Sequence, residues 1–469
     1  MILENVVSDA REHSAALWDV ELRDGYVHDV RPSEASPDTP AQLVLPPLCH
    51  PHIHLDKAYI LTCNNRGSPQ YPDYSDLGPT SGLFQEALAN TSRAKARYTP
   101  EDLYRRGSQL LATSYAQGVT STRAFVEIDH ATGTMPLTTA IRHKRDFAHL
   151  LELQICAFAQ DPIFSTADGD ANRATMEDAL DAFAGHIEVL GTTPYVERSR
   201  EASLLNIKWA ITRALKYRLH LDFHLDYTLE PPLPLPSQAP LIYSVIDLLK
   251  EHDWVRIADG AKTIVFGHCT QLSMLGDAER KALALAIIES KLPIHFVGLP
   301  TSDIFMMGRP DSNATSSHHR PRGTIHVPSM IKDLGLSACV GVNNVGNAFT
   351  PFGTGDPLQL ASWLVGIFQV GTATDAELLY ECVSNRARQA IGLGSDAQCG
   401  PIRKGQKLSD MLLVKNLRTV ELPGVLEQTS ITVIQRPRLS IKDVVWDPPE
   451  TNLRSITRWT PQPGVEHLY

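Results

Sequence analysis

The sequence predicts an α/β protein of parallel β/α units, with smaller β structure at both ends of the chain. In the middle of the chain, apolar strand-like runs alternate with segments of helical periodicity, which is the pattern of parallel β/α units. The 469 residues, of which 43% are hydrophobic, suffice for a large barrel core with an accessory domain. Both termini instead carry short alternating runs, which are typical of antiparallel strands.

The N-terminal segment has the pattern of a β-hairpin. The runs 17–22 and 26–30 alternate apolar and polar residues, and Asp24 and Gly25 lie between them as a turn. The runs 407–415 and 430–435, near the other terminus, have the same strand character. The sequence alone leaves open whether the segments from the two ends pair.

The central elements follow one another in regular order. Strand-like runs are expected at 43–57, 118–127, 151–161, 219–226 and 265–271. Helical patterns occupy 100–117, 174–185, 199–217, 277–291 and 374–391. Two long connections, 62–99 and 302–322, follow strands. Because loops after strand ends build the mouth of a barrel, we expect these connections to cover the site.

Histidines at strand ends are the main candidates for chemistry. His52 and His54 lie two apart in an apolar strand-like run, so their side chains point to the same side. Two imidazoles on one side form half of a metal site, since neutral imidazole binds zinc and iron well. His224 and His268 occupy later strand ends. For His224, a role in the core is the alternative interpretation.

These segments resemble, in order, the amidohydrolase superfamily and within it the cytosine deaminase-like branch. The resemblance extends over nearly the whole chain, and its matching segments are 43–57, 118–127, 151–161, 219–226, 265–271 and 341–354. The resemblance implies a (β/α)8 TIM-like barrel with a small β-sandwich formed from both termini. The expected boundaries are 1–44 plus 400–445 for the sandwich, 45–399 for the barrel and 446–469 for a C-terminal tail.

The resemblance also assigns residues to the site. It implies that one divalent metal ion, with zinc as the first expectation and iron or manganese as alternatives, is held by His52, His54 and His224. His268 matches a family histidine that binds metal or polarises the substrate. The expected substrate-binding residues are Gln160, Lys57, Phe349 and Asn344. Each could instead have a purely structural role, such as a salt bridge for Lys57 and core packing for Phe349.

The chain departs from the family at two acid–base positions. Tyr227 stands where the deaminases carry a catalytic Glu, and Asn343 stands where they carry a metal-binding Asp. An amide cannot accept a proton from water near neutral pH, and a phenol has an ordinary pKa near about 10. The candidate catalytic residues are therefore His268, Tyr227, Asn343 and Asp226. In a hydrolase, His268, Tyr227 or Asp226 would replace the missing carboxylates.

Two functions remain open at this stage. The first is a metal-dependent hydrolase of a C–N bond in a small cyclic amide or amidine. The second is a lyase, cyclase or isomerase that uses the metal as a Lewis acid, or an inactive binding scaffold. In either case we expect a small-molecule substrate. Barrels of this family often form oligomers, so the resemblance also implies a homo-oligomer.

Composition restricts the other partners. A net charge of −10 argues against a nucleic-acid partner. No apolar stretch reaches the length of a membrane span, and the first residues lack the pattern of a secretion signal. The seven cysteines are scattered, which favours free thiols over disulfides. The expected compartment is the cytoplasm.

Overall fold

The structure is a computed structural model, and it describes most of the chain. The described residues are 1–457 except for 12–15, 37–38, 63–67, 233–238, 259, 261, 309–322, 395–398, 409 and 426–428. Parts of the expected loop 302–322 and of the expected tail 446–469 therefore lie outside the described residues. Among the described residues, no helix is both long and apolar enough to cross a membrane.

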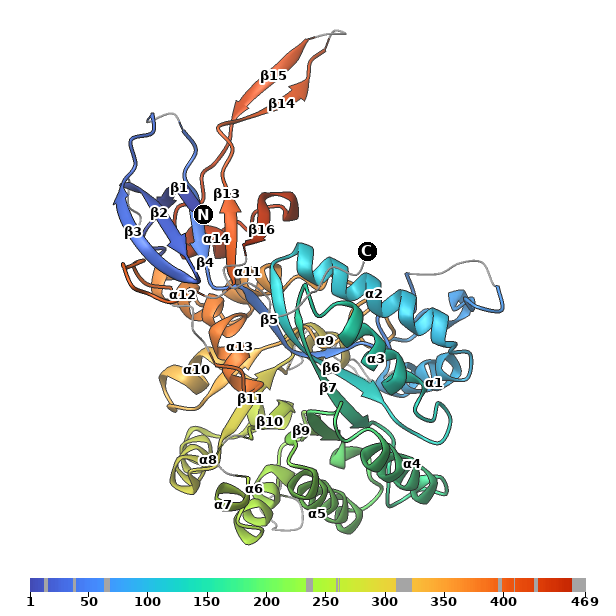
Figure 1. The fold of residues 1–469 in the computed structure, drawn as a ribbon. Helices are drawn as coiled ribbons and strands as arrows, with labels where there is room; N and C mark the ends of the chain where they lie inside the picture. Colours follow the sequence, from blue (N-terminus) through green and yellow to red (C-terminus); the bar gives the residue numbers. More distant parts are fainter. Residues whose placement is uncertain are drawn as a thin grey trace, which may run out of the picture.

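The centre of the molecule is an eight-stranded parallel sheet in the order β12-β11-β10-β9-β8-β7-β6-β5 (Figure 1). Its strands are β5 (Leu48–His54), β6 (Val119–Glu127), β7 (Glu152–Ala159), β8 (Val189–Thr192), β9 (His220–Leu225), β10 (Ile264–His268), β11 (Ile294–Gly298) and β12 (Ala338–Val340). The segment after β12 closes the ring. The backbone N–H of His54 donates to the Asn343 carbonyl at 2.9 Å, and that of Asn343 donates to the His52 carbonyl at 3.1 Å.

Most of the helices lie between these strands along the chain and surround the barrel (Figure 1). The helices are α1 (Phe84–Lys95), α2 (Pro100–Ala116), α3 (Met135–Asp146), α4 (Gly169–Ala182), α5 (Arg200–Tyr217), α6 (Leu241–Glu251), α7 (Trp254–Ile257), α8 (Asp277–Ser290), α9 (Pro300–Met306), α10 (Val327–Lys332), α11 (Pro357–Ile367), α12 (Ala373–Cys382), α13 (Asn385–Ala390) and α14 (Ile441–Trp446). The expected helix 374–391 is two helices, because the backbone of Ser384 leaves the helical region at φ −131° and ψ −101°. The start of the expected loop 302–322 lies in α9.

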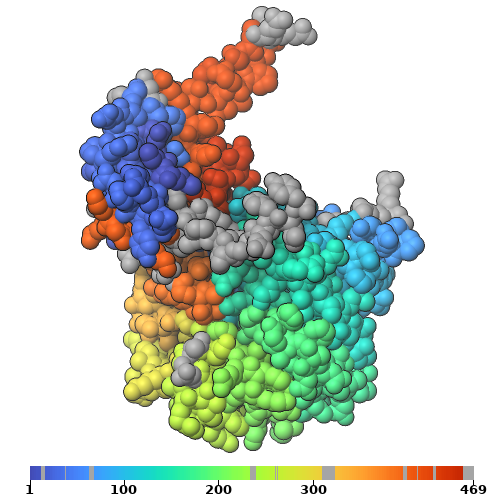
Figure 2. Space-filling model, in the orientation of Figure 1, coloured from blue at the N-terminus to red at the C-terminus, as the bar shows by residue number. Residues whose placement is uncertain are grey.

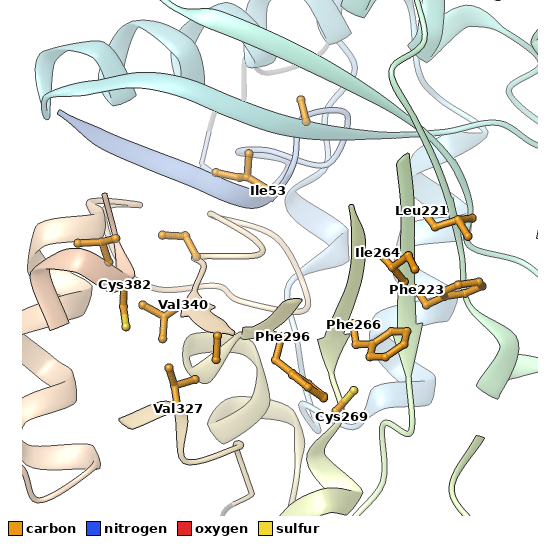
Figure 3. Close-up of a cluster of buried hydrophobic side chains, with 14 of the residues drawn as sticks. Ile53, Leu221, Phe223, Ile264, Phe266, Cys269, Phe296, Val327, Val340 and Cys382 are labelled. Atoms are coloured by element: carbon orange, nitrogen blue, oxygen red, sulfur yellow. The ribbon is translucent and has the colours of Figure 1, made fainter. Parts of the chain in front are cut away.

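The main core lies between the strands and the helices. Phe223, Phe266 and Phe296 occupy matching positions on β9, β10 and β11, and all three are buried. Figure 3 shows them in this order across neighbouring strands. Side chains alternate along a strand, so the residues next to these phenylalanines, such as His224, point into the barrel. The apolar layer thereby sets the direction of the site residues.

The expected first barrel strand, 43–57, is two strands. Pro46 and Pro47 lack backbone N–H groups and separate β4 (Gln42–Leu45) from β5. Strand β4 belongs to a six-stranded sheet in the order β16-β13-β4-β1-β2-β3. Its other members are β1 (Ile2–Val7), β2 (Leu17–Arg23), β3 (Tyr26–Pro32), β13 (Met411–Lys415) and β16 (Arg454–Thr457).

This sheet joins the two ends of the chain beside the barrel, as expected (Figure 1). Strand β4 pairs with β1 on one side and with β13 on the other. The expected turn is present, since Asp24 and Gly25 have φ of 50° and 78°. The boundaries differ in two places. Strand β16 lies within the expected tail, and the run 430–435 lies outside the sheet, in the separate hairpin of β14 (Thr419–Pro423) and β15 (Ser430–Ile434).

Candidate metal and substrate site

Three histidines converge at the end of the barrel where β5 and β9 finish. The Nε2 atom of His224 lies 3.1 Å from that of His52 and 3.3 Å from that of His54. All three rings are buried. Gly267, paired with His224 across β9 and β10, leaves the room that they need, because a Cβ atom there would come within 3.2 Å of the His52 ring. The three histidines predicted from the sequence as metal ligands therefore lie together.

The three nitrogens fit a divalent ion. Two nitrogens bound at about 2.0–2.1 Å to a tetrahedral ion lie about 3.3 Å apart, close to the spacing found here. Burial lowers the pKa of each imidazole well below its usual value of 6.5, so each offers a lone pair rather than a positive charge. His224 cannot donate one N–H to both neighbours at once. A cation among the three nitrogens would satisfy every lone pair.

A charged layer lies beneath the histidines inside the barrel. Asp222 Oδ1 is 3.9 Å from His52 Nδ1, and Asp222 Oδ2 accepts from the Arg123 guanidinium at 2.9 Å. The Arg123 Nε also donates to Gln154. Burial raises the pKa of Asp222 to about 7, although Arg123 opposes this. The distance from Asp222 to His52 is too long for a hydrogen bond, so Asp222 acts on His52 through its charge alone.

His268 lies beside the three histidines, with its ring centroid 5.1 Å from that of His224. Its Nδ1 makes a 2.7 Å hydrogen bond with Asp303 Oδ1, which directs the other ring nitrogen away from the carboxylate. The Tyr227 ring packs on His268 with centroids 4.0 Å apart. Burial raises the pKa of the Tyr227 phenol well above 10, so the phenol is neutral and can donate a hydrogen bond but cannot act as a base.

Asn343 and Asn344 lie in the segment that closes the barrel. Asn343 has a φ of 67°, a conformation that asparagine tolerates better than most residues. Its buried Oδ1 has no hydrogen-bond partner among the described residues. The Asn344 Oδ1 accepts from Asn347 Nδ2 at 2.7 Å. Both asparagines contribute to the wall of the pocket in front of the histidines.

A buried lysine brings a positive charge to the same pocket. The Lys57 ammonium pairs with Glu127 and donates to Gln160 Oε1 at 3.2 Å. It also lies 5.3 Å from the centroid of the Phe349 ring. Lys57 therefore contacts both Gln160 and Phe349, and all three, which were predicted as substrate-binding residues, line the pocket.

The pocket is small, with a cavity volume of about 20 Å³. Three of its wall residues were not predicted as site residues: Phe84, Tyr195 and Ser302. Phe84 begins α1, Tyr195 lies in a single helical turn after β8, and Ser302 lies in α9. Phe84 comes from the long connection 62–99, which was expected to cover the site. The described wall contains histidine, lysine, amide, hydroxyl and aromatic groups but no carboxylate.

Asp226 lies elsewhere, which corrects the expectation that it serves as an acid–base residue. Its φ of 47° turns the chain after β9, and its carboxylate accepts from the N–H groups of Leu241 and Ile242 at 2.7 and 3.1 Å. Asp226 therefore caps the first turn of α6. Burial raises its pKa to about 6, although these two hydrogen bonds favour the ionised form.

The capping role predicts a clear difference between two variants. Asp226→Asn keeps an oxygen acceptor, so turnover and metal content should stay within about twofold of wild type, whereas loss of a general acid–base group costs about 10²–10⁴-fold. Asp226→Ala should lower the free energy of unfolding by about 1–3 kcal/mol, because two buried N–H groups lose their acceptor. Denaturant unfolding and turnover measure the two effects. A large loss of turnover in the folded Asp226→Asn protein would return this residue to the mechanism.

The chain matches no known protein-family model. It is 22% identical over 353 residues to the uncharacterized protein YahJ of Escherichia coli (strain K12), a match that covers 73% of this chain and 65% of that protein. It is 20% identical over 410 residues to N-isopropylammelide isopropyl amidohydrolase of Pseudomonas sp. (strain ADP), covering 87% and 88%. The chain thus spans less than two thirds of the first of these relatives.

Several solved structures have the same fold as this chain. The chain is similar to 5-methylcytosine deaminase from Klebsiella pneumoniae, with a TM-score of 0.70 and 22% identity over 93% of this chain and 98% of that one. It is also similar to N-isopropylammelide isopropylaminohydrolase from Burkholderia multivorans, with a TM-score of 0.60 and 21% identity over 89% and 92%. At these identities the likeness establishes the fold, and it confirms the barrel predicted from the sequence.

Proposed function

We propose that the protein is a metal-dependent hydrolase that cleaves a C–N bond of a small cyclic amide or amidine. The observation that carries the proposal is the convergence of three buried imidazoles, His52, His54 and His224, beside a pocket that His54 and His224 line. A divalent ion held there, with zinc as the first candidate, supplies a Lewis acid that lowers the pKa of water. Relatives of the same fold include a 5-methylcytosine deaminase and an N-isopropylammelide hydrolase.

The pocket wall suits a flat polar ring. Phe84 and Phe349, whose ring centroids are 5.9 Å apart, supply apolar faces. The Gln160 oxygen accepts from Lys57, which leaves the Gln160 amide N–H groups to donate to a ring carbonyl or nitrogen. Lys57 adds a positive charge that favours an electron-rich oxygen of the substrate.

His268 is the best candidate to move protons. The Asp303 carboxylate accepts a hydrogen bond from Nδ1 of His268. The other ring nitrogen of His268, Nε2, therefore takes a proton from water and returns it to the leaving nitrogen. The neutral Tyr227 phenol and the Asn343 amide then act as hydrogen-bonding groups that orient water and substrate. This set replaces the two family carboxylates that the chain lacks.

Metal analysis and turnover together test the proposal. The purified protein should hold about one equivalent of a divalent metal. It should release ammonia or an amine from at least one member of a panel of amino- and alkylamino-pyrimidines and triazines. Chelation should abolish this turnover, and zinc should restore it. Metal content below about a tenth of an equivalent after supplementation would contradict every metal-dependent function.

The absence of a carboxylate from the described pocket wall favours one alternative, a lyase or isomerase that uses the metal only as a Lewis acid. Turnover in ¹⁸O-labelled water separates the two reactions. Hydrolysis places one labelled oxygen in the product, whereas a lyase or isomerase places none by its chemistry.

A further inference from the structure

Three residues that line the pocket, Lys57, Gln160 and Asn344, present hydrogen-bonding groups of fixed polarity, and we call them the donor wall. The Lys57 ammonium has donors only. It meets the Gln160 side chain at 3.2 Å, so the atom of Gln160 that it meets is the oxygen. The NH₂ group of Gln160 is therefore left to donate into the pocket that both residues line.

Asn347 fixes the orientation of the Asn344 amide. The two ends of an amide side chain are told apart by their partners. Asn347 Oδ1 accepts from the backbone N–H groups of Phe349 and Thr350 at 3.0 and 3.2 Å. Its Nδ2 therefore donates, to the Lys57 carbonyl at 3.2 Å and to Asn344 Oδ1 at 2.7 Å. Because the oxygen of Asn344 is occupied in this way, its NH₂ group is the end that remains for a ligand.

The donor wall has little access to bulk water. Lys57 and Asn344 are buried and Gln160 is partly buried. Figure 2 shows the barrel segments, coloured from teal to yellow, packed into a continuous surface on that face. The described residues that line the pocket include no carboxylate that could accept from these donors. Since a buried donor without an acceptor is unfavourable, a ligand that supplies acceptors completes the site.

We infer that the ring bound in this pocket presents at least two carbonyl oxygens to the donor wall. The inference rests on the proposed function and specifies its substrate, which is a ring amide or imide and not an amidine whose amino groups face this wall. The reacting carbon lies at the histidines, so the two oxygens belong to the part of the ring that stays unchanged.

The hydrogen-bonding capacity of each group leads to this choice. A carbonyl oxygen has two lone pairs, so one such oxygen can accept from both Lys57 and Gln160, which already contact each other. A second carbonyl oxygen accepts from the Asn344 NH₂ group. An amino group of the ring in either place would bring donor against donor and leave both without a partner.

Two pyrimidines test the inference by binding alone. Uracil and 2,4-diaminopyrimidine share one ring and differ at two positions, where the first has carbonyl oxygens and the second has amino groups. The full-length protein with one equivalent of zinc is titrated by calorimetry at a pH at which both rings are neutral. Uracil should bind at least about 10-fold more tightly, because an unpaired buried donor costs about that factor. Equal affinities, tighter binding of 2,4-diaminopyrimidine, or no binding of either ring at millimolar concentration would overturn the inference.

Gln160→Glu exchanges the donor for an acceptor of the same size. The carboxylate keeps one oxygen for the Lys57 ammonium and turns the other toward the pocket. Uracil binding should weaken by at least about 10-fold, and 2,4-diaminopyrimidine binding should become tighter. Gln160→Met removes the donor without adding charge, so it should weaken the binding of uracil alone. Variants that fold, as judged by circular dichroism, but change both affinities alike would overturn the inference.

The matched control is Gln271→Glu. Gln271 also follows a barrel strand, β10, but its NH₂ group donates to the Glu230 carbonyl at 3.1 Å, and neither residue lines the pocket. Both affinities should stay within about twofold of wild type in this control.

Binding and turnover fail separately. A protein that prefers uracil and loses this preference in Gln160→Glu, but releases no ammonia or amine from any ring, would support the donor wall and contradict hydrolysis. A protein that hydrolyses a ring but binds uracil and 2,4-diaminopyrimidine equally would support the proposed function and overturn this inference.

Discussion

His224→Ala is expected to release the metal ion and abolish turnover. His224 is the central member of the three, since its Nε2 lies within 3.3 Å of both His52 and His54, and it is the only one of them that comes from β9. Without it, two ligands from one strand remain. Metal content should fall from about one equivalent to below about a tenth. We expect kcat/KM to fall by at least about 10³-fold, because loss of an outer partner of a ligand alone costs about 10–100-fold.

His50→Gln is the matched control for that variant. His50 lies on the same strand as His52 and His54 and is equally buried, but its Nε2 is 3.1 Å from the hydroxyl of Ser114 on α2. The glutamine amide can keep that hydrogen bond. The control should retain metal and turnover. A His224→Ala protein that holds a full equivalent of metal would show that the ion binds elsewhere.

Strand periodicity was enough to predict part of the site. The alternation of side chains places His52 and His54 on one side from the sequence alone. His224, 170 residues from His54 along the chain, joins them only because β9 lies across the barrel, and the resemblance to a known fold supplied that information. The same resemblance found Lys57 and Gln160, which contact each other over 103 residues.

Other positions could not be placed from the sequence, because they depend on local backbone geometry and on packing. Asp226 lies two residues after His224 and is expected on the same side, but a positive φ turns its carboxylate onto α6. Asp303 gives no signal in the sequence, because its contact with His268 depends on how α9 packs at the end of β11. The run 430–435 has the pattern of a strand wherever it lies, so the pattern could not distinguish a strand of the terminal sheet from one of the separate hairpin of β14 and β15.

Lys95→Ala is expected to cause the largest loss of stability. The Lys95 ammonium donates to Glu127 at 2.8 Å, Asp129 at 2.6 Å and Asp161 at 2.8 Å. Burial disfavours its charge, but attraction to the three carboxylates outweighs burial and holds its pKa well above 10.5. Removing one partner of a buried ion pair costs about 3–5 kcal/mol, since it leaves unpaired charge behind. The lower end is expected here, because Glu127 keeps Lys57 as a partner.

Calcium should restore part of that stability. The three carboxylates offer oxygens that lie within 4.8 Å of one another, and oxygens around Ca²⁺ at about 2.4 Å span up to about that distance. Lys95→Ala opens the space between them, so millimolar Ca²⁺ should raise the melting temperature of this variant and leave that of the wild type unchanged. Lys332→Ala is the control, because Lys332 pairs with Asp375 at a more exposed place and should cost less than about 1 kcal/mol. Equal melting temperatures for the two variants, or an equal calcium effect on all three proteins, would show that the Lys95 ammonium does not hold this cluster together.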